Sequence, residues 1–172
     1  MRIGMLGFAS VLAMVSMLVG CGSSTPVMGQ YDIEVSLAPE LAASPPALTV
    51  DIVGASSANY AELSAKDPKA WFAGGDVNRA NTTKLTTVFG PGDTGSKQLK
   101  RRDKAQVDAA WKTWRDMKAT RLFVLVNLPR DGSIRKIELP LDRKRWKTET
   151  IKLEINAGGV RSTNGPEPEA VK

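Results

Sequence analysis

Hydrophobic and polar residues alternate in short segments along most of the chain, which is the pattern of half-buried β-strands. Tyr31, Ile33, Val35 and Leu37 fall on one side of such a segment, with polar residues between them. The patterns predict strands at residues 31–37, 48–53, 82–89, 122–128, 137–141 and 151–155. The run from 122 to 128 is almost continuously apolar, so it predicts a central strand covered on both faces. Pro140 places the next strand at a sheet edge or a bulge.

One longer segment, residues 96–119, has helical periodicity. Asp103 and Gln106 match a capping box, so we expect the firm part of the helix to span 103–119. Its apolar stripe comprises Val107, Ala110, Trp111, Trp114 and Met117. We favour a stripe that packs on the core over one that fills a partner's groove.

Two shorter helical segments are also predicted. Asn59 is a possible cap for a turn through Leu63, and Asp67-Pro68 has the sequence of a helix start. The second of these carries Trp71 and Phe72, which we expect to cover an open edge of the sandwich, with a binding platform as the alternative.

These elements predict a mainly β fold. Strands and helices do not alternate one for one, so parallel βαβ winding is disfavoured. A small antiparallel β-sandwich with one long amphipathic helix inserted fits best, over residues 31–160. Residues 161–172 have no apolar pattern and are predicted to form a disordered tail.

The composition restricts the chemistry that the chain can perform. Among 172 residues there is no His and one Cys, so nucleophilic catalysis with an imidazole base is excluded and a zinc site is disfavoured. No pair of carboxylates has a recognisable catalytic spacing. We therefore expect no enzyme activity, no cofactor and no metal.

The first 21 residues indicate export. Arg2 is followed by an apolar stretch over residues 3–19, which predicts a signal peptide of residues 1–20. The segment Leu18-Val19-Gly20-Cys21 resembles the lipobox of bacterial lipoprotein precursors. The resemblance implies cleavage before Cys21 and attachment of a diacylglyceryl group to its thiol. An uncleaved transmembrane anchor with an incidental Cys is the alternative.

Residues 21–30 are predicted to be a flexible tether between the lipid and the domain. Gly22, rather than Asp, follows the lipidated Cys, which resembles the outer-membrane pattern of these precursors. In a host with two membranes, we therefore expect the domain to be anchored to the outer membrane and to face the periplasm.

The formal net charge of +6 is concentrated in two basic clusters. The first is predicted at the start of the long helix and comprises Lys97, Lys100, Arg101, Arg102 and Lys104; the second precedes the last strand and comprises Arg143, Lys144, Arg145 and Lys147. Both are candidate binding sites for anionic lipid or an acidic protein surface, and a solvated face is the alternative. Nucleic acid is disfavoured because an exported lipoprotein rarely meets it.

The layout of the strand patterns is similar to the outer-membrane lipoprotein family of type VI secretion systems. The similar segments are residues 31–37, 48–53, Trp71-Phe72, 122–126 and 151–155. The resemblance implies a transthyretin-like β-sandwich that binds a periplasmic part of an inner-membrane subunit. Our first hypothesis is a non-catalytic assembly or docking module. The second is a lipoprotein that binds anionic lipid or cell-wall polymer through its basic face.

Overall fold

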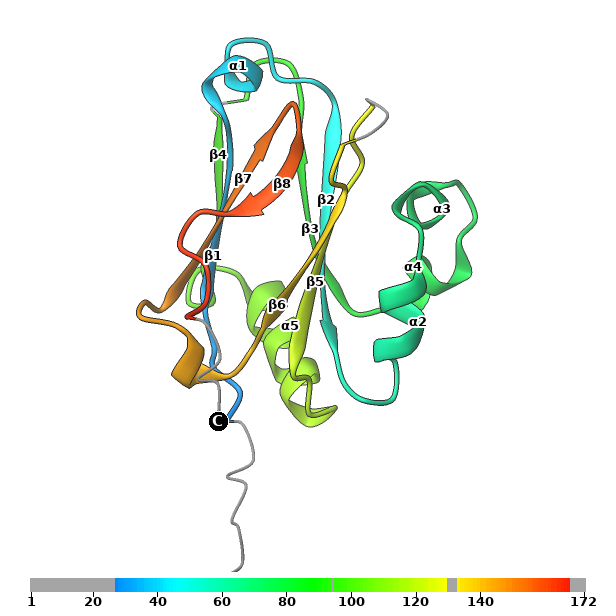
Figure 1. Ribbon diagram of the computed structural model, residues 1–172, viewed down its shortest axis with the longest axis vertical. Helices are drawn as coiled ribbons and strands as arrows, with labels where there is room; N and C mark the ends of the chain where they lie inside the picture. The colour runs from blue at the N-terminus through cyan, green and yellow to red at the C-terminus, as the bar shows by residue number, and fades with distance from the viewer. Residues whose placement is uncertain (1–26, 94, 130–132, 168–172) are drawn as a thin grey trace, which may run out of the picture.

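Two four-stranded sheets face each other in the computed structural model, which describes residues 27–93, 95–129 and 133–167 (Figure 1). The first sheet has the order β4-β1-β7-β8, with β1 (Asp32–Leu37), β4 (Ser96–Leu99), β7 (Thr150–Asn156) and β8 (Gly159–Ser162). The second has the order β3-β2-β5-β6, with β2 (Leu48–Ala55), β3 (Lys84–Phe89), β5 (Arg121–Val126) and β6 (Lys136–Pro140). The predicted small β-sandwich is confirmed.

The helices of this part of the chain are short apart from one. They are α1 (Pro39–Ala42), α2 (Tyr60–Ala65), α3 (Pro68–Phe72), α4 (Val77–Asn81), α5 (Ala105–Asp116) and the 3-10 helix η1 (Arg143–Arg145). Asp67 caps α3 as its sequence predicts, because its side chain accepts a hydrogen bond from the Lys69 amide. None of these described helices has the length and apolar character needed to cross a membrane.

Strand β1 has neighbours of opposite direction on its two sides. It pairs with β7 in parallel, from Asp32 opposite Thr150 to Leu37 opposite Ile155. On its other side it pairs with β4 in the antiparallel sense, with Ile33 opposite Leu99. The start of β1, the start of β7 and the end of β4 therefore lie at the same end of the sheet.

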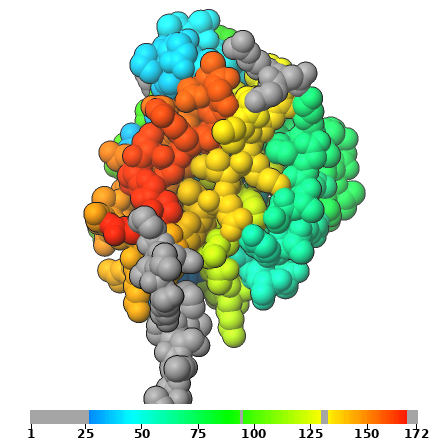
Figure 2. Space-filling model, in the orientation of Figure 1, coloured from blue at the N-terminus to red at the C-terminus, as the bar shows by residue number. Residues whose placement is uncertain are grey.

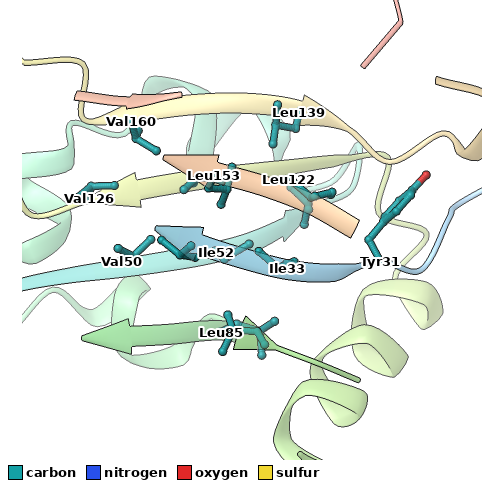
Figure 3. Close-up of a cluster of buried hydrophobic side chains, with 14 of the residues drawn as sticks. Tyr31, Ile33, Val50, Ile52, Leu85, Leu122, Val126, Leu139, Leu153 and Val160 are labelled. Carbon is teal, nitrogen blue, oxygen red and sulfur yellow. The ribbon is translucent and has the colours of Figure 1, made fainter. Parts of the chain in front are cut away.

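The core lies between the two sheets and is closed at one end by α5. Alternate residues of the strands point inward, among them Ile33, Val50, Leu122 and Leu153 (Figure 3). The predicted apolar stripe of α5 joins the same cluster: Val107, Ala110, Trp111 and Trp114 are buried, and Met117 is partly buried against them. The preference for a core-facing stripe is confirmed.

A helical segment between β2 and β3 covers the outer face of the second sheet (Figure 1; turquoise and green in Figure 2). We call α2, α3 and α4 together the helical insertion. Trp71 is fully buried there in a second cluster with Leu63, Phe123 and Leu125. The expectation that Trp71 covers a sandwich edge is therefore wrong. Both faces of β5 are buried, as its continuous apolar run predicts.

Asp51 holds the helical insertion to the sheet. Its carboxylate is fully buried and accepts hydrogen bonds from Trp71 Nε1 at 2.9 Å, Arg79 Nε at 2.7 Å and Thr86 Oγ1 at 2.7 Å. These partners come from α3, α4 and β3. A buried carboxylate is tolerated because it is both ion-paired and hydrogen-bonded.

The long helix is shorter than predicted. It spans Ala105–Asp116, and its N-cap is Lys104, with no side-chain hydrogen bond, so the helix over 103–119 and its Asp103–Gln106 capping box are wrong. Residues Ser96–Leu99, also predicted as helical, form β4 because β1 offers an open edge for pairing. Pairing between distant segments overrides a weak local preference here.

Two predicted boundaries also differ from the structure. β8 continues past residue 160, because Glu154 and Leu153 pair with Arg161 and Ser162 across a hairpin. The predicted disordered tail therefore begins with two residues of a β-strand. Residues 168–172 of that tail lie outside the described part of the chain. Likewise, residues 27–30 of the predicted tether are fixed: Arg143 N donates to Val27 O and Gly29 N donates to Leu141 O, at 2.9 and 2.8 Å.

Gly54 on β2 lets α5 pack directly on the sheet. A Cβ atom at this position would lie 2.5 Å from Trp114 Cγ, whereas one at Gly74 would have no atom within 4 Å. We predict that Gly54→Ala lowers the free energy of unfolding by about 2 kcal/mol or more through overpacking. The matched control Gly74→Ala should change it by less than about 0.5 kcal/mol. Urea denaturation measures both, and equal effects would contradict the close packing of Trp114 on β2.

A candidate basic groove at the tether end of the sandwich

The strand directions bring the two predicted basic clusters to one end of the molecule. Residues after β4 and residues before β7 both lie beside the start of β1, because β4 is antiparallel and β7 is parallel to β1. In Figure 1 the first described residues, η1 and α5 are all at this lower end, while α1 is at the opposite end. We call this lower part the tether end.

A groove of about 540 Å³ lies between these segments. Its walls come from residues 27–31, the turn after β4, the last turn of α5 and residues 143–149. The charged residues that line it are Arg101, Arg115, Arg143, Lys147 and Glu149. We call this feature the basic groove.

Arg101 is held in place by the start of β1. Its guanidinium Nη1 donates a hydrogen bond to Gln30 Oε1, and its Nε lies 3.8 Å from Asp32 Oδ1. The backbone amide of Arg101 also donates to Asp32 Oδ1, at 3.0 Å. Arg101 Nε is buried and has no hydrogen-bond partner among the described residues. The neighbours therefore hold the Arg101 side chain in place but leave one of its hydrogen-bond donors unused.

Like Arg101, Lys147 has a carboxylate partner, whereas the remaining two cations of the groove, Arg115 and Arg143, have none among the described residues. Lys147 Nζ lies 2.6 Å from Glu167 Oε1, and the hydrogen bond to Glu167 raises the pKa of Lys147. The side chains of Arg115 and Arg143 are exposed and have no ion-pair partner in the described part of the chain. These two guanidinium groups leave the groove able to bind an anion.

Tyr31 forms the floor of the groove. Its ring packs against the rings of Trp146 and Trp111, with centroids 5.5 and 6.1 Å away. The hydroxyl points away from the labelled core residues (Figure 3), is buried, and has no hydrogen-bond partner within the described residues. Burial, followed by the negative charge of Asp142, raises the pKa of Tyr31 to about 12.

The other predicted basic residues do not line the groove. Lys97 on β4 is ion-paired with Asp93 and lies over the Phe89 ring. Lys100 and Lys104 line two separate hollows. Arg102 precedes α5 and is exposed. None of these four sits inside α5, because the predicted helix start was wrong.

The second cluster also has some residues inside the groove and some outside it. Lys144 is exposed on η1, and Arg145 Nε donates to Glu167 O at 2.5 Å. Asp142 caps η1 by accepting a hydrogen bond from the Lys144 amide. Only Arg101 of the first cluster and Arg143 and Lys147 of the second therefore meet in the groove.

Arg115 is the groove cation that the sequence analysis missed. It is off the apolar stripe of α5 and occupies the last turn of that helix, where a cation interacts favourably with the helix dipole. The helix dipole alone accounts for an arginine at this position, so the sequence offered no reason to assign Arg115 to a binding site. It lines the same groove as Arg143 because α5 packs across the end of the sandwich.

The fold is a small β-sandwich with a helical insertion and a basic groove at the tether end. Among the described residues there is no group of three or more His, Cys, Asp or Glu side chains placed to hold a metal ion. Cys21, the predicted lipidation site, lies outside the described residues.

No protein-family model matches the chain, and no curated protein matches it significantly. Among solved structures, it is similar to Serratia marcescens Lip, a membrane-bound component of the type VI secretion system. That comparison has 16% identity and a TM-score of 0.51, and covers 85% of this chain and 100% of Lip. The likeness to Lip shows a shared fold.

Two weaker likenesses have TM-scores below 0.5. The C-terminal domain of the type VI secretion protein TssM from EAEC has 12% identity and a TM-score of 0.49, over 77% of this chain and 99% of that domain. The type VI lipoprotein TssJ1 from Pseudomonas aeruginosa has 14% identity and a TM-score of 0.40, over 83% and 100%.

The buried hydroxyl of Tyr31 gives a pH-dependent prediction. The pKa of Tyr31 is raised from 10.0 in the unfolded chain to about 12 in the fold, so the unfolded state loses this proton first. This titration therefore leaves the stability of the folded protein unchanged below pH 10 and lowers it as the pH rises towards about 12. We expect Tyr31→Phe to be as stable as the wild type at pH 7, or slightly more stable, because it removes an unsatisfied hydroxyl.

The test is chemical denaturation of both proteins from pH 7 to the alkaline limit of reversible unfolding. The stability advantage of Tyr31→Phe should grow above pH 10. A difference that stays constant with pH would show that the Tyr31 hydroxyl titrates as it does in the unfolded chain.

Proposed function

We propose that this chain is a lipid-anchored, non-catalytic docking module of the bacterial envelope, in a type VI secretion membrane complex. The observation that carries the proposal is the fold, which spans the whole of Serratia marcescens Lip at a TM-score of 0.51. The lipobox-like segment ending in Cys21 is independent support, because Lip is described as membrane bound. The proposed location is the periplasmic side of the outer membrane.

The charged side chains of Asp51, which is buried, and Lys136, which is half-buried, have structural roles, and this supports a non-catalytic function. Asp51, the fully buried carboxylate, has three donors and is closed off by the helical insertion. Lys136 Nζ donates to the carbonyl groups of Leu63, Ser64 and Lys66 at the end of α2. Burial lowers the pKa of Lys136, yet its ammonium is fully engaged with these carbonyls.

The second candidate function is binding of an anionic envelope ligand, either lipid or cell-wall polymer. The convergence of Arg115 and Arg143 on one groove favours it, since neither has an acidic partner among the described residues. The two functions are compatible in one protein, because the groove occupies the tether end and leaves the α1 end free.

Crosslinking in intact cells tests the docking function. We would place a photo-crosslinking amino acid at Ser44, which is exposed near α1, and at Thr148, which is exposed at the tether end. The protein is then purified and its adducts are identified by mass spectrometry. We expect Ser44 to capture a periplasmic segment of a secretion-system membrane protein.

The matched control is the same crosslinking protein with Cys21→Ser. It should leave the membrane fraction after a salt wash and lose most of the Ser44 adduct, because the anchor no longer concentrates it at the complex. Recovery of no secretion-system protein from the anchored form would contradict the docking function. Retention of Cys21→Ser in washed membranes would contradict the lipid anchor.

A further inference from the structure

We propose that the basic groove binds phosphate groups of anionic phospholipids in the leaflet that holds the anchor, and so fixes the orientation of the sandwich on that membrane. The inference deepens the proposed function and rests on its lipid anchor. It concerns a site that the fold likeness to Lip does not supply, because it depends on side chains of this chain.

The groove is the part of the domain that the anchor keeps nearest to the membrane. Val27 lines the groove, and Cys21 precedes it by six residues. A fully extended chain spans at most about 3.6 Å per residue, so the groove edge stays within about 22 Å of the lipidated residue. The hydrogen bonds from residues 27–30 to η1 and Leu141 keep this segment attached to the domain, so it does not lengthen the tether.

The surface of the groove is suited to the region of lipid headgroups. The guanidinium groups of Arg115 and Arg143 each present several donors in a plane, which matches phosphate oxygens. Lys147 adds a cation that is 82% exposed at the rim. Val27, which is 64% exposed, adds an apolar side chain at the edge of the same groove.

Proximity favours lipid over other anions. A polybasic segment held near an anionic surface gains about 1 kcal/mol per basic residue, and this attraction falls off within a Debye length of about 8 Å. The anchor keeps the groove edge within about 22 Å of the lipidated residue, so the groove can repeatedly come within this range of the headgroups, whereas an acidic protein must first diffuse to it. The consequence is an orientation in which α1 points away from the membrane.

The lipidated protein in vesicles tests this orientation. Single cysteines are introduced at Thr148, in the groove, and at Ser44, near α1, and a membrane-impermeant maleimide reports their exposure. In phosphatidylcholine vesicles containing phosphatidylglycerol, we expect Thr148→Cys to react at least about fivefold more slowly than Ser44→Cys. The combined substitution Arg115→Gln/Arg143→Gln should remove this protection.

The matched control removes the same charge elsewhere. Lys69→Gln/Arg135→Gln changes α3 and the residue before β6, both outside the groove. It should leave the protection of Thr148→Cys unchanged. Equal labelling of the two cysteines, or equal effects of the two double substitutions, would overturn the proposal.

A second measurement does not depend on the anchor. The chain from residue 21 with Cys21→Ser keeps every described contact of the sandwich, and its flotation with vesicles reports headgroup binding. We expect it to bind phosphatidylglycerol-containing vesicles more tightly than pure phosphatidylcholine, and the groove substitutions to weaken binding about tenfold or more. Equal binding to both vesicles, or competition by inorganic phosphate alone with no lipid preference, would reject a lipid site while leaving the anchor and the docking function intact.

Discussion

The parallel pairing of β1 with β7 is the constraint on which the arrangement of this protein depends. The two strands are separated by more than a hundred residues of chain, yet they lie in register over six residue pairs in the middle of the first sheet. Their shared direction sends the segments that precede both strands to one end of the sandwich. The tether, η1 and the groove residues meet there for that reason.

A second constraint acts on the opposite side of the molecule. The outer face of the second sheet is apolar at Val53, Phe123 and Leu125, so it requires a cover. The helical insertion supplies that cover, and Asp51 joins it to the sheet through donors from three different elements. The middle strands β2 and β5 are therefore buried on both faces, whereas the edge strands β3 and β6 keep exposed residues such as Val88 and Glu138.

Local patterns were sufficient for most strands and insufficient for the site. Alternation around Ile33, Val50 and Leu153 identified strands that bury one face in the core, since a periodicity of two is set by local geometry. β4 and β8 were missed because each is four residues long and is stabilised by a neighbour that is distant in sequence or by a hairpin. The same limitation applies to the groove, whose cations Arg115 and Arg143 come from elements that only the tertiary fold brings together.

The fixed segment before β1 has a mechanical consequence. Val27, Met28 and Gly29 are bonded to residues 141–143 in addition to leading into β1. A force on the N-terminus is therefore transmitted to the connection between β6 and β7 before it reaches β1. Because β6 and β7 belong to different sheets, the force acts on both sheets. Under tension the domain would rotate as one rigid body about residue 27. A force on the anchor would therefore reorient the sandwich before it could separate β1 from the core.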